Sequence, residues 1–163
     1  MRQQIASNNG WKTAMQRRRI LTSALGLMSV AAAAGVSTRS KAETEKKKQK
    51  VVYHLSDVEK VTFVLGNIQN HIAGVGGPEY VDIVLVVHGP ALKSFHKMMA
   101  DPDVRQAVDN LKEEGVDLNA CANTMKAQHV DEGGLLPGFV KVDQGGVVRI
   151  AQLQGDGYVY IRP

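Results

Sequence analysis

Residues 51–163 predict an α/β domain in which helices cover both faces of a mostly parallel sheet. Short runs rich in β-branched residues recur along this part of the chain, and segments with apolar residues at helical spacing separate them. Glycine and proline interrupt this pattern repeatedly, which indicates short connections. Strands and helices that alternate in this way are typical of a small doubly wound domain.

Five strands and five helices are expected. The clearest strand, residues 81–88, is a nearly continuous β-branched run that suits burial on both faces. Ser56 and Glu59 form a capping-box pattern before the first helix, and Asp101 with Pro102 opens the third. The expected strands are residues 51–55, 81–88, 116–120, 139–142 and 157–161, and the expected helices are residues 58–72, 91–99, 102–114, 123–128 and 146–154.

The basic character of the chain lies in its first part. The whole chain has 20 Lys and Arg against 16 Asp and Glu, and 5% of its residues are aromatic. Residues 1–42 hold seven basic residues and no acidic one, so residues 43–163 have 13 basic against 16 acidic residues. An acidic domain poor in aromatic residues disfavours nucleic-acid binding, and we expect no nucleic-acid partner.

Residues 1–42 contain the three parts of an export signal. A basic stretch ends in Arg17-Arg18-Arg19-Ile20-Leu21, an uncharged alanine-rich run follows, and Ser40-Lys41-Ala42 offers a cleavage site between small residues. The paired arginines resemble a twin-arginine signal, which predicts a periplasmic location. Residues 43–50, rich in Lys, Glu and Gln, are expected to form a charged linker to the domain at residues 51–163.

Two alternatives for the leader stay open. It could be a Sec signal, or it could remain as an uncleaved anchor, because residues 20–38 are uncharged and long enough to span a bilayer. Contact with a membrane is expected only through such an uncleaved leader.

Three segments are expected to meet at one edge of the sheet. Ser56 and Asp57 follow the first strand, His88 follows the second, and Cys121 follows the third. In sheets of this class ligands bind beyond the carboxyl ends of the strands, so this edge is the expected functional site.

Cys121, the one cysteine of the chain, is the principal candidate for chemistry. It lies where a strand passes into a helix, and the positive end of a helix favours the thiolate. A single cysteine excludes an intrachain disulfide and a self-contained dithiol switch. Three roles stay open for it: a persulfide or sulfenate carrier, a disulfide to another chain, or an inert buried thiol.

His88 is a weaker candidate, as a base or proton donor near Cys121 or as a hydrogen-bonded residue at the Gly89-Pro90 turn. No spacing typical of metal ligands occurs, and no glycine loop joins a strand to a helix in the manner of a phosphate site. We therefore expect neither a metal nor a cofactor.

The other histidines are expected outside the site. His54 is interpreted as a core or interface residue, and His71 and His96 as residues on helix surfaces. His129 follows Cys121 closely enough in the chain to approach it, although a solvated loop position is the more ordinary reading.

Three motifs of the domain resemble the DsrE/DsrF-like family, in particular an exported, single-gene branch of it. They are residues 84–92 (VLVVHGPAL), 121–125 (CANTM) and 153–161 (LQGDGYVYI). The resemblance spans about residues 50–163 and implies a three-layer α/β sandwich around a five-stranded sheet. It also implies homo-oligomers, trimers or hexamers, and a cysteine at the position of Cys121 that accepts sulfane sulfur as a persulfide.

Two functions from different classes follow. The first is an exported protein that handles sulfur through a persulfide on Cys121, with a sulfur donor or acceptor protein as a partner; it would be a carrier or transferase rather than a turnover enzyme, a distinction left open. The second is a non-enzymatic oligomeric binding module of the periplasm without cysteine chemistry. A hydrolase or isomerase that uses His88 and Cys121 is a weaker third alternative, which requires the two side chains within hydrogen-bond reach.

Overall fold

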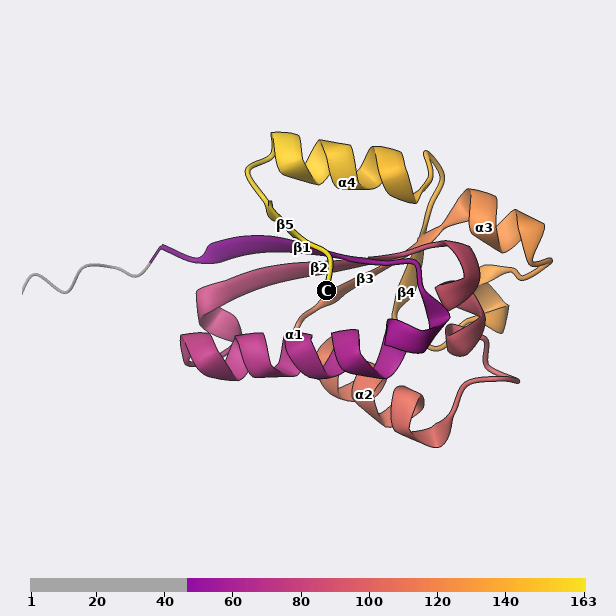
Figure 1. Ribbon diagram of the computed structural model, residues 1–163, viewed down its shortest axis with the longest axis horizontal. Helices are drawn as coiled ribbons and strands as arrows, with labels where there is room; N and C mark the ends of the chain where they lie inside the picture. Colours follow the sequence, from indigo (N-terminus) through magenta and orange to yellow (C-terminus); the bar gives the residue numbers. More distant parts are fainter. Residues whose placement is uncertain (1–46) are drawn as a thin grey trace, which may run out of the picture. The chain divides into compact units, whose positions relative to one another are not determined.

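The computed structural model describes residues 47–163, and the expected leader lies outside the described residues. Figure 1 shows its helices and strands. They are β1 (Gln49–Leu55), α1 (Val61–Val75), β2 (Val81–Val87), α2 (Pro102–Glu113), β3 (Asp117–Cys121), α3 (Ala122–Ala127), β4 (Phe139–Val142), α4 (Gly146–Gly155) and β5 (Val159–Ile161). Within residues 47–163, every helix is too short or too polar to cross a membrane.

The five strands form one sheet in the order β4-β3-β2-β1-β5, and all neighbouring pairs are parallel. From β1 to β4 the chain moves across the sheet in one direction, and it then returns to add β5 on the other side of β1. Because such crossovers are right-handed, the reversal places α4 on the opposite face from α1 and α2. The result is the expected three-layer α/β arrangement (Figure 1).

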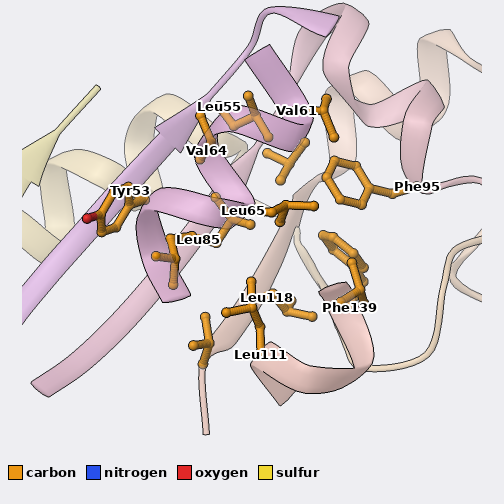
Figure 2. Packing of buried hydrophobic residues seen from close by; sticks show 14 of the residues in the cluster. Tyr53, Leu55, Val61, Val64, Leu65, Leu85, Phe95, Leu111, Leu118 and Phe139 are labelled. Atoms are coloured by element: carbon orange, nitrogen blue, oxygen red, sulfur yellow. The ribbon is translucent and has the colours of Figure 1, made fainter. Parts of the chain in front are cut away.

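The face covered by α1 and α2, called here the α1 face, carries the main core. Alternate strand residues point to it, and they pack against the apolar sides of the two helices. Figure 2 shows this packing, in which the rings of Phe95 and Phe139 lie 5.0 Å apart. Among its fully buried side chains are Leu55, Leu65, Ile68, Leu85, Leu111 and Leu118.

The other face, called here the α4 face, has a smaller core. Val52, Val84 and Val86 of the strands pack against Ile150 and Leu153 of α4. Towards the carboxyl ends of the strands the residues that alternate in phase with these valines are polar. Because α4 has a narrow apolar side, it leaves this end of the face to polar side chains.

The start of the domain differs from the expectation in two respects. β1 begins at Gln49, so Gln49 and Lys50 belong to the strand and not to the linker, because β2 extends far enough to pair with both. The capping box at Ser56 is also wrong. A 3-10 turn, Val58–Lys60, precedes α1, and the Ser56 hydroxyl donates instead to Asp57 Oδ1 at 3.1 Å.

Two further segments differ. The expected helix at residues 91–99 is a 3-10 helix, Gly89–Phe95, whose buried Leu92 and Phe95 match the three-residue turn of that helix type. The last strand begins at Val159 rather than at 157, because Gly157 adopts φ 87° in the turn after α4. Asp101 caps α2 as expected, with its Oδ1 3.0 Å from the Asp103 N–H.

Candidate functional site

Cys121 is the last residue of β3 and directly precedes α3. Ala120 points into the core of the α1 face, so the alternation of a strand places the Cys121 side chain on the α4 face. The residue is buried, with 6% of its surface exposed. The sequence predicts this position of Cys121 between a strand and a helix.

The sulfur of Cys121 lies among hydrogen-bond donors. Burial raises the pKa of the thiol, but the hydrogen bonds that the sulfur accepts lower it by more, so that the pKa lies below its ordinary value. The donors are the backbone N–H of Gly146 at the start of α4, the backbone N–H and hydroxyl of Thr124, and the backbone N–H of Asn123. Such an environment stabilises the thiolate relative to the thiol.

Thr124 is oriented by the turn that follows β2. The Gly89 N–H donates to Thr124 Oγ1 at 3.0 Å, and because this oxygen already accepts that bond, its own proton is available for the Cys121 sulfur. Gln128, the residue that follows α3, holds the same turn, since its Nε2 donates to the Gly89 carbonyl at 2.9 Å. Two strand ends are thereby fastened together around the thiol.

The start of α4 approaches Cys121 through two glycines. Gly145 has φ 88°, and a Cβ there would lie 2.9 Å from Asn123 Nδ2 and 3.9 Å from the Cys121 sulfur. Farther along α4, Arg149 Nε donates to Oδ1 of the buried Asn119 at 2.9 Å. Glycine allows the close approach, and the Arg149–Asn119 bond fastens the helix to β3 two residues before the cysteine.

His88 lies beside Cys121. A Cβ built on Gly146 would be 3.4 Å from both the Cys121 Cβ and the His88 Cβ. The Cβ atoms of Cys121 and His88 therefore flank the same small space. His88 Nε2 lies 2.5 Å from His54 Nε2 of β1, and His54 Nδ1 lies 2.6 Å from the Tyr160 hydroxyl of β5. Among the described residues, no hydrogen bond joins His88 to the cysteine.

Both histidines are held in the neutral form. Burial, the nearby His88 and the Arg162 guanidinium lower the pKa of His54 to about 4, against the opposing effect of Asp57. Burial and Arg162 likewise lower the pKa of His88. At neutral pH each imidazole therefore has one nitrogen that donates and one that accepts.

A polar rim borders this pair at the end of β1. Arg162 Nη2 lies 3.0 Å from Ser56 Oγ and 3.3 Å from Asp57 Oδ2. The side chain of Asp57 is partly exposed, and the pKa of its carboxyl is lowered by the hydrogen bond from Ser56 and then by Arg162. The segments after β1, β2 and β3 thus meet with the end of β5 at one edge of the sheet.

The sequence reasoning found part of this arrangement. It placed Cys121, His88 and the Ser56-Asp57 pair at one edge, where the structure has them. It missed His54, which it interpreted as a core or interface residue, and it did not place Tyr160 of β5 in the site. The phase of His54 with Val52 was a signal for the face, but the neighbour on β5 follows only from the sheet order.

The remaining histidines lie elsewhere. His71 bonds the Tyr53 hydroxyl at 2.9 Å, and His96 bonds Gln128 at 2.8 Å. His129 has φ 53° in the turn after α3, and no hydrogen bond of the described residues links it to Cys121. In residues 47–163, no group of three or more His, Cys, Asp and Glu side chains is arranged to hold a metal ion.

A pocket of the described residues lies at a different place, away from this edge. It runs along β5 and the start of β1, between the lysines at 47, 48 and 50 and the apolar side chains of Val51, Val159 and Ile161. Cys121, His54 and His88 are not among the residues that line it. The small polar site at the carboxyl edge is therefore the better candidate for chemistry.

Comparison with known proteins agrees with this fold. The chain matches 71% of its length to the structure of a protein of unknown function, MTH1491 from Methanobacterium thermoautotrophicum, at 30% identity and a TM-score of 0.62, over 100% of that chain. It matches the crystal structure of the ychN protein from E. coli over 71% of this chain and 99% of that one, at 15% identity and a TM-score of 0.58. No curated protein matches.

A family model covers most of the sequence. It matches residues 22–163, which include all described residues and part of the expected leader. The match extends over far more than half of the chain, and the fold agrees with the two solved structures. The chain belongs to the DsrE/DsrF-like family.

Proposed function

We propose that this protein handles sulfane sulfur, which it carries as a persulfide on Cys121. The observation that carries the proposal is the set of donors around the sulfur, which lowers the pKa of the thiol and favours the nucleophilic thiolate. Membership of the DsrE/DsrF-like family supports a role related to sulfur relay.

The loading step is a simple sulfur transfer. The Cys121 thiolate attacks the outer sulfur of a hydropersulfide donor, RSSH. The bond between Sγ and that sulfur forms, the RS–S bond breaks with its electron pair on RS, and the proton of the donor ends on RSH. The products are the Cys121 persulfide anion and a thiol, so the step needs no oxidant or reductant.

Two features of the surroundings suit this step. Gly145 has no side chain in the space 3.9 Å from the sulfur, where a larger residue would crowd a second sulfur atom. The N–H groups of Gly146, Thr124 and Asn123 stabilise negative charge on Sγ despite its burial. The hydrolase alternative has less support, because His88 bonds His54 and not the cysteine.

The proposal includes export and self-assembly. Export to the periplasm through the leader at residues 1–42 rests on the sequence, and the N-terminus of the protein recovered from a periplasmic fraction tests it. Assembly is supported by exposed apolar residues near the site, namely Val140, Val147 and Val148. Light scattering that shows a monomer would contradict it.

Mass spectrometry tests the persulfide directly. After treatment with inorganic polysulfide, the wild-type protein should gain about 32 Da, one sulfur atom, and Cys121→Ser should gain nothing. No gain on the wild type, or an equal gain on the variant, contradicts the proposal and leaves the binding module without cysteine chemistry.

A matched pair of threonine variants sharpens this test. Thr124→Val removes one donor to the sulfur and should raise the pKa of the thiol by about half a unit to one unit, which slows alkylation by iodoacetamide at neutral pH. Thr62→Val, on the exposed side of α1, is the control and should react like the wild type. Equal rates for the two variants would show that the donor set does not activate the thiol.

A further inference from the structure

A chain of hydrogen bonds crosses the α4 face from the edge strand to the candidate site. It runs from the Tyr160 hydroxyl to His54 Nδ1 at 2.6 Å, and from His54 Nε2 to His88 Nε2 at 2.5 Å. The two imidazole rings are stacked, with centroids 4.7 Å apart and an angle of 22° between planes. None of these three side chains is among the donors to the Cys121 sulfur.

The chain ends next to the cysteine. The last pair between β2 and β3 joins Val87 and Ala120, so His88 and Cys121 are the next residues along these two strands. The Cβ atoms of His88 and Cys121 both lie 3.4 Å from the position that a Cβ on Gly146 would occupy. The imidazole of His88 thus begins beside the thiol, on the same face of the sheet.

The proton positions along the chain follow from the chemistry of the groups. A phenol donates a hydrogen bond better than it accepts one, so Tyr160 donates to His54 Nδ1. His54 is neutral, so its proton lies on Nε2 and is donated to His88 Nε2. His88 is also neutral and must then carry its proton on Nδ1. Within residues 47–163 no hydrogen bond engages that nitrogen.

The charges around the pair favour an anion over a metal ion. The groups that face the two imidazoles are the Arg162 guanidinium, the Asp57 carboxylate, the Tyr160 phenol and the Cys121 thiol. Arg162 is near enough to lower the pKa of both histidines, so it also repels a cation placed between them. The N–H of His88 Nδ1 is instead suited to an anionic acceptor.

A persulfide on Cys121 supplies such an acceptor. Its inner sulfur, Sγ, already accepts hydrogen bonds from Gly146, Thr124 and Asn123. Its outer sulfur carries most of the negative charge, and the donors of those three residues are engaged by the inner sulfur. A second, separate donor is needed to hold the outer atom.

We propose that His88 donates a hydrogen bond from Nδ1 to the outer sulfur of the Cys121 persulfide, and that His54 and Tyr160 are positioning residues that fix this proton on His88. The inference rests on the proposed function, because it requires the persulfide to form. It divides the site into one set of donors for the inner sulfur and one donor for the outer sulfur.

The experiment measures two pKa values in each variant. The rate of alkylation by iodoacetamide is followed against pH by intact mass, first for the unloaded thiol and then for protein loaded with inorganic polysulfide. The variants are His88→Val, which removes the donor, and His88→Asn, whose amide nitrogen takes the place of Nδ1. Tyr160→Phe removes the first hydroxyl of the chain, and Tyr158→Phe is its control, because Tyr158 bonds Asp82 away from the site.

The expected result is specific to the loaded protein. In His88→Val the pKa of the persulfide should rise by about one unit, the effect of one hydrogen bond to a charged group, and His88→Asn should restore it. Tyr160→Phe should raise it by about half a unit, and Tyr158→Phe should leave it unchanged. The pKa of the unloaded thiol should be the same in all four variants.

Three results would overturn the inference. They are an unchanged persulfide pKa in His88→Val, an equal change in the pKa of the unloaded thiol, or a Tyr160→Phe variant that behaves like Tyr158→Phe. Failure of the wild-type protein to load is a different outcome, since it removes the proposed function itself together with the inference built on it.

Discussion

The α1 face and the α4 face are built from alternate residues of the same strands, yet they are closed in different ways. Two long helices cover the α1 face and bury a large apolar cluster, which includes Leu85 and Val87 of β2. One helix covers the α4 face and forms with its strands a cluster of five buried residues, and the carboxyl ends of the strands there carry His54, His88 and Cys121. The thinner layer is the one that leaves room for polar side chains.

A tyrosine–histidine pair on each face makes the same contrast. On the α1 face the Tyr53 hydroxyl bonds His71 at 2.9 Å, and burial raises the pKa of Tyr53. That bond joins a strand to the helix packed on it. On the α4 face the bond from Tyr160 to His54 continues to His88, which lies beside the cysteine. One kind of interaction therefore stabilises the fold in one layer and orients a candidate site in the other.

The largest expected effect comes from opening a cavity on each face. Leu85→Ala on the α1 face should lower the free energy of unfolding by about 3 kcal/mol, and Leu153→Ala on the α4 face by about 2 kcal/mol. Only Leu153→Ala should also raise the pKa of the Cys121 thiol, because α4 carries the Gly146 N–H. Urea unfolding and the pH dependence of alkylation measure the two quantities. An equal change of the thiol pKa in both variants would break the contrast between the faces.

A smaller effect is expected from two glycines with nearly the same φ. A Cβ built on Gly145 (φ 88°) would lie 2.9 Å from Asn123 Nδ2, whereas one built on Gly157 (φ 87°) has no atom within 4 Å. Gly157→Ala should cost about 1 kcal/mol of stability from backbone strain alone. Gly145→Ala should cost about 2 to 3 kcal/mol, and it should slow alkylation of Cys121 as the start of α4 shifts. If both variants left the thiol unchanged, the position of α4 would not control it.

The smallest effect concerns acid stability. The pKa of His54 is lowered to about 4, so the folded protein binds fewer protons there than the unfolded chain. Stability should therefore fall as the pH drops from about 6.5 towards 4, and His54→Gln should show a shallower fall over that range. Unfolding midpoints in urea at several pH values measure it. The same slope in both proteins would mean that His54 titrates normally in the folded state.

Much of the fold could be predicted because its signals are local. The β-branched run that became β2 and the Asp101-Pro102 start of α2 depend on residues within one or two turns of the chain. The place of Cys121 between a strand and a helix is local for the same reason. Where a local pattern met a distant partner, as the Ser56 hydroxyl meets Arg162 from the far end of the chain, the sequence reasoning was wrong.

The sequence by itself determined the alternation of strands and helices, the candidate thiol, and the segments that end at the same edge. The tertiary structure decided which of those segments are neighbours. Tyr160 and His54 are 106 residues apart and meet because β5 returns to the side of β1. The N–H of Gly146 reaches the Cys121 sulfur because the same return places α4 on the face opposite α1 and α2. Periodicity reports the surroundings of each element one at a time, whereas the order of strands is set by the packing of all of them together.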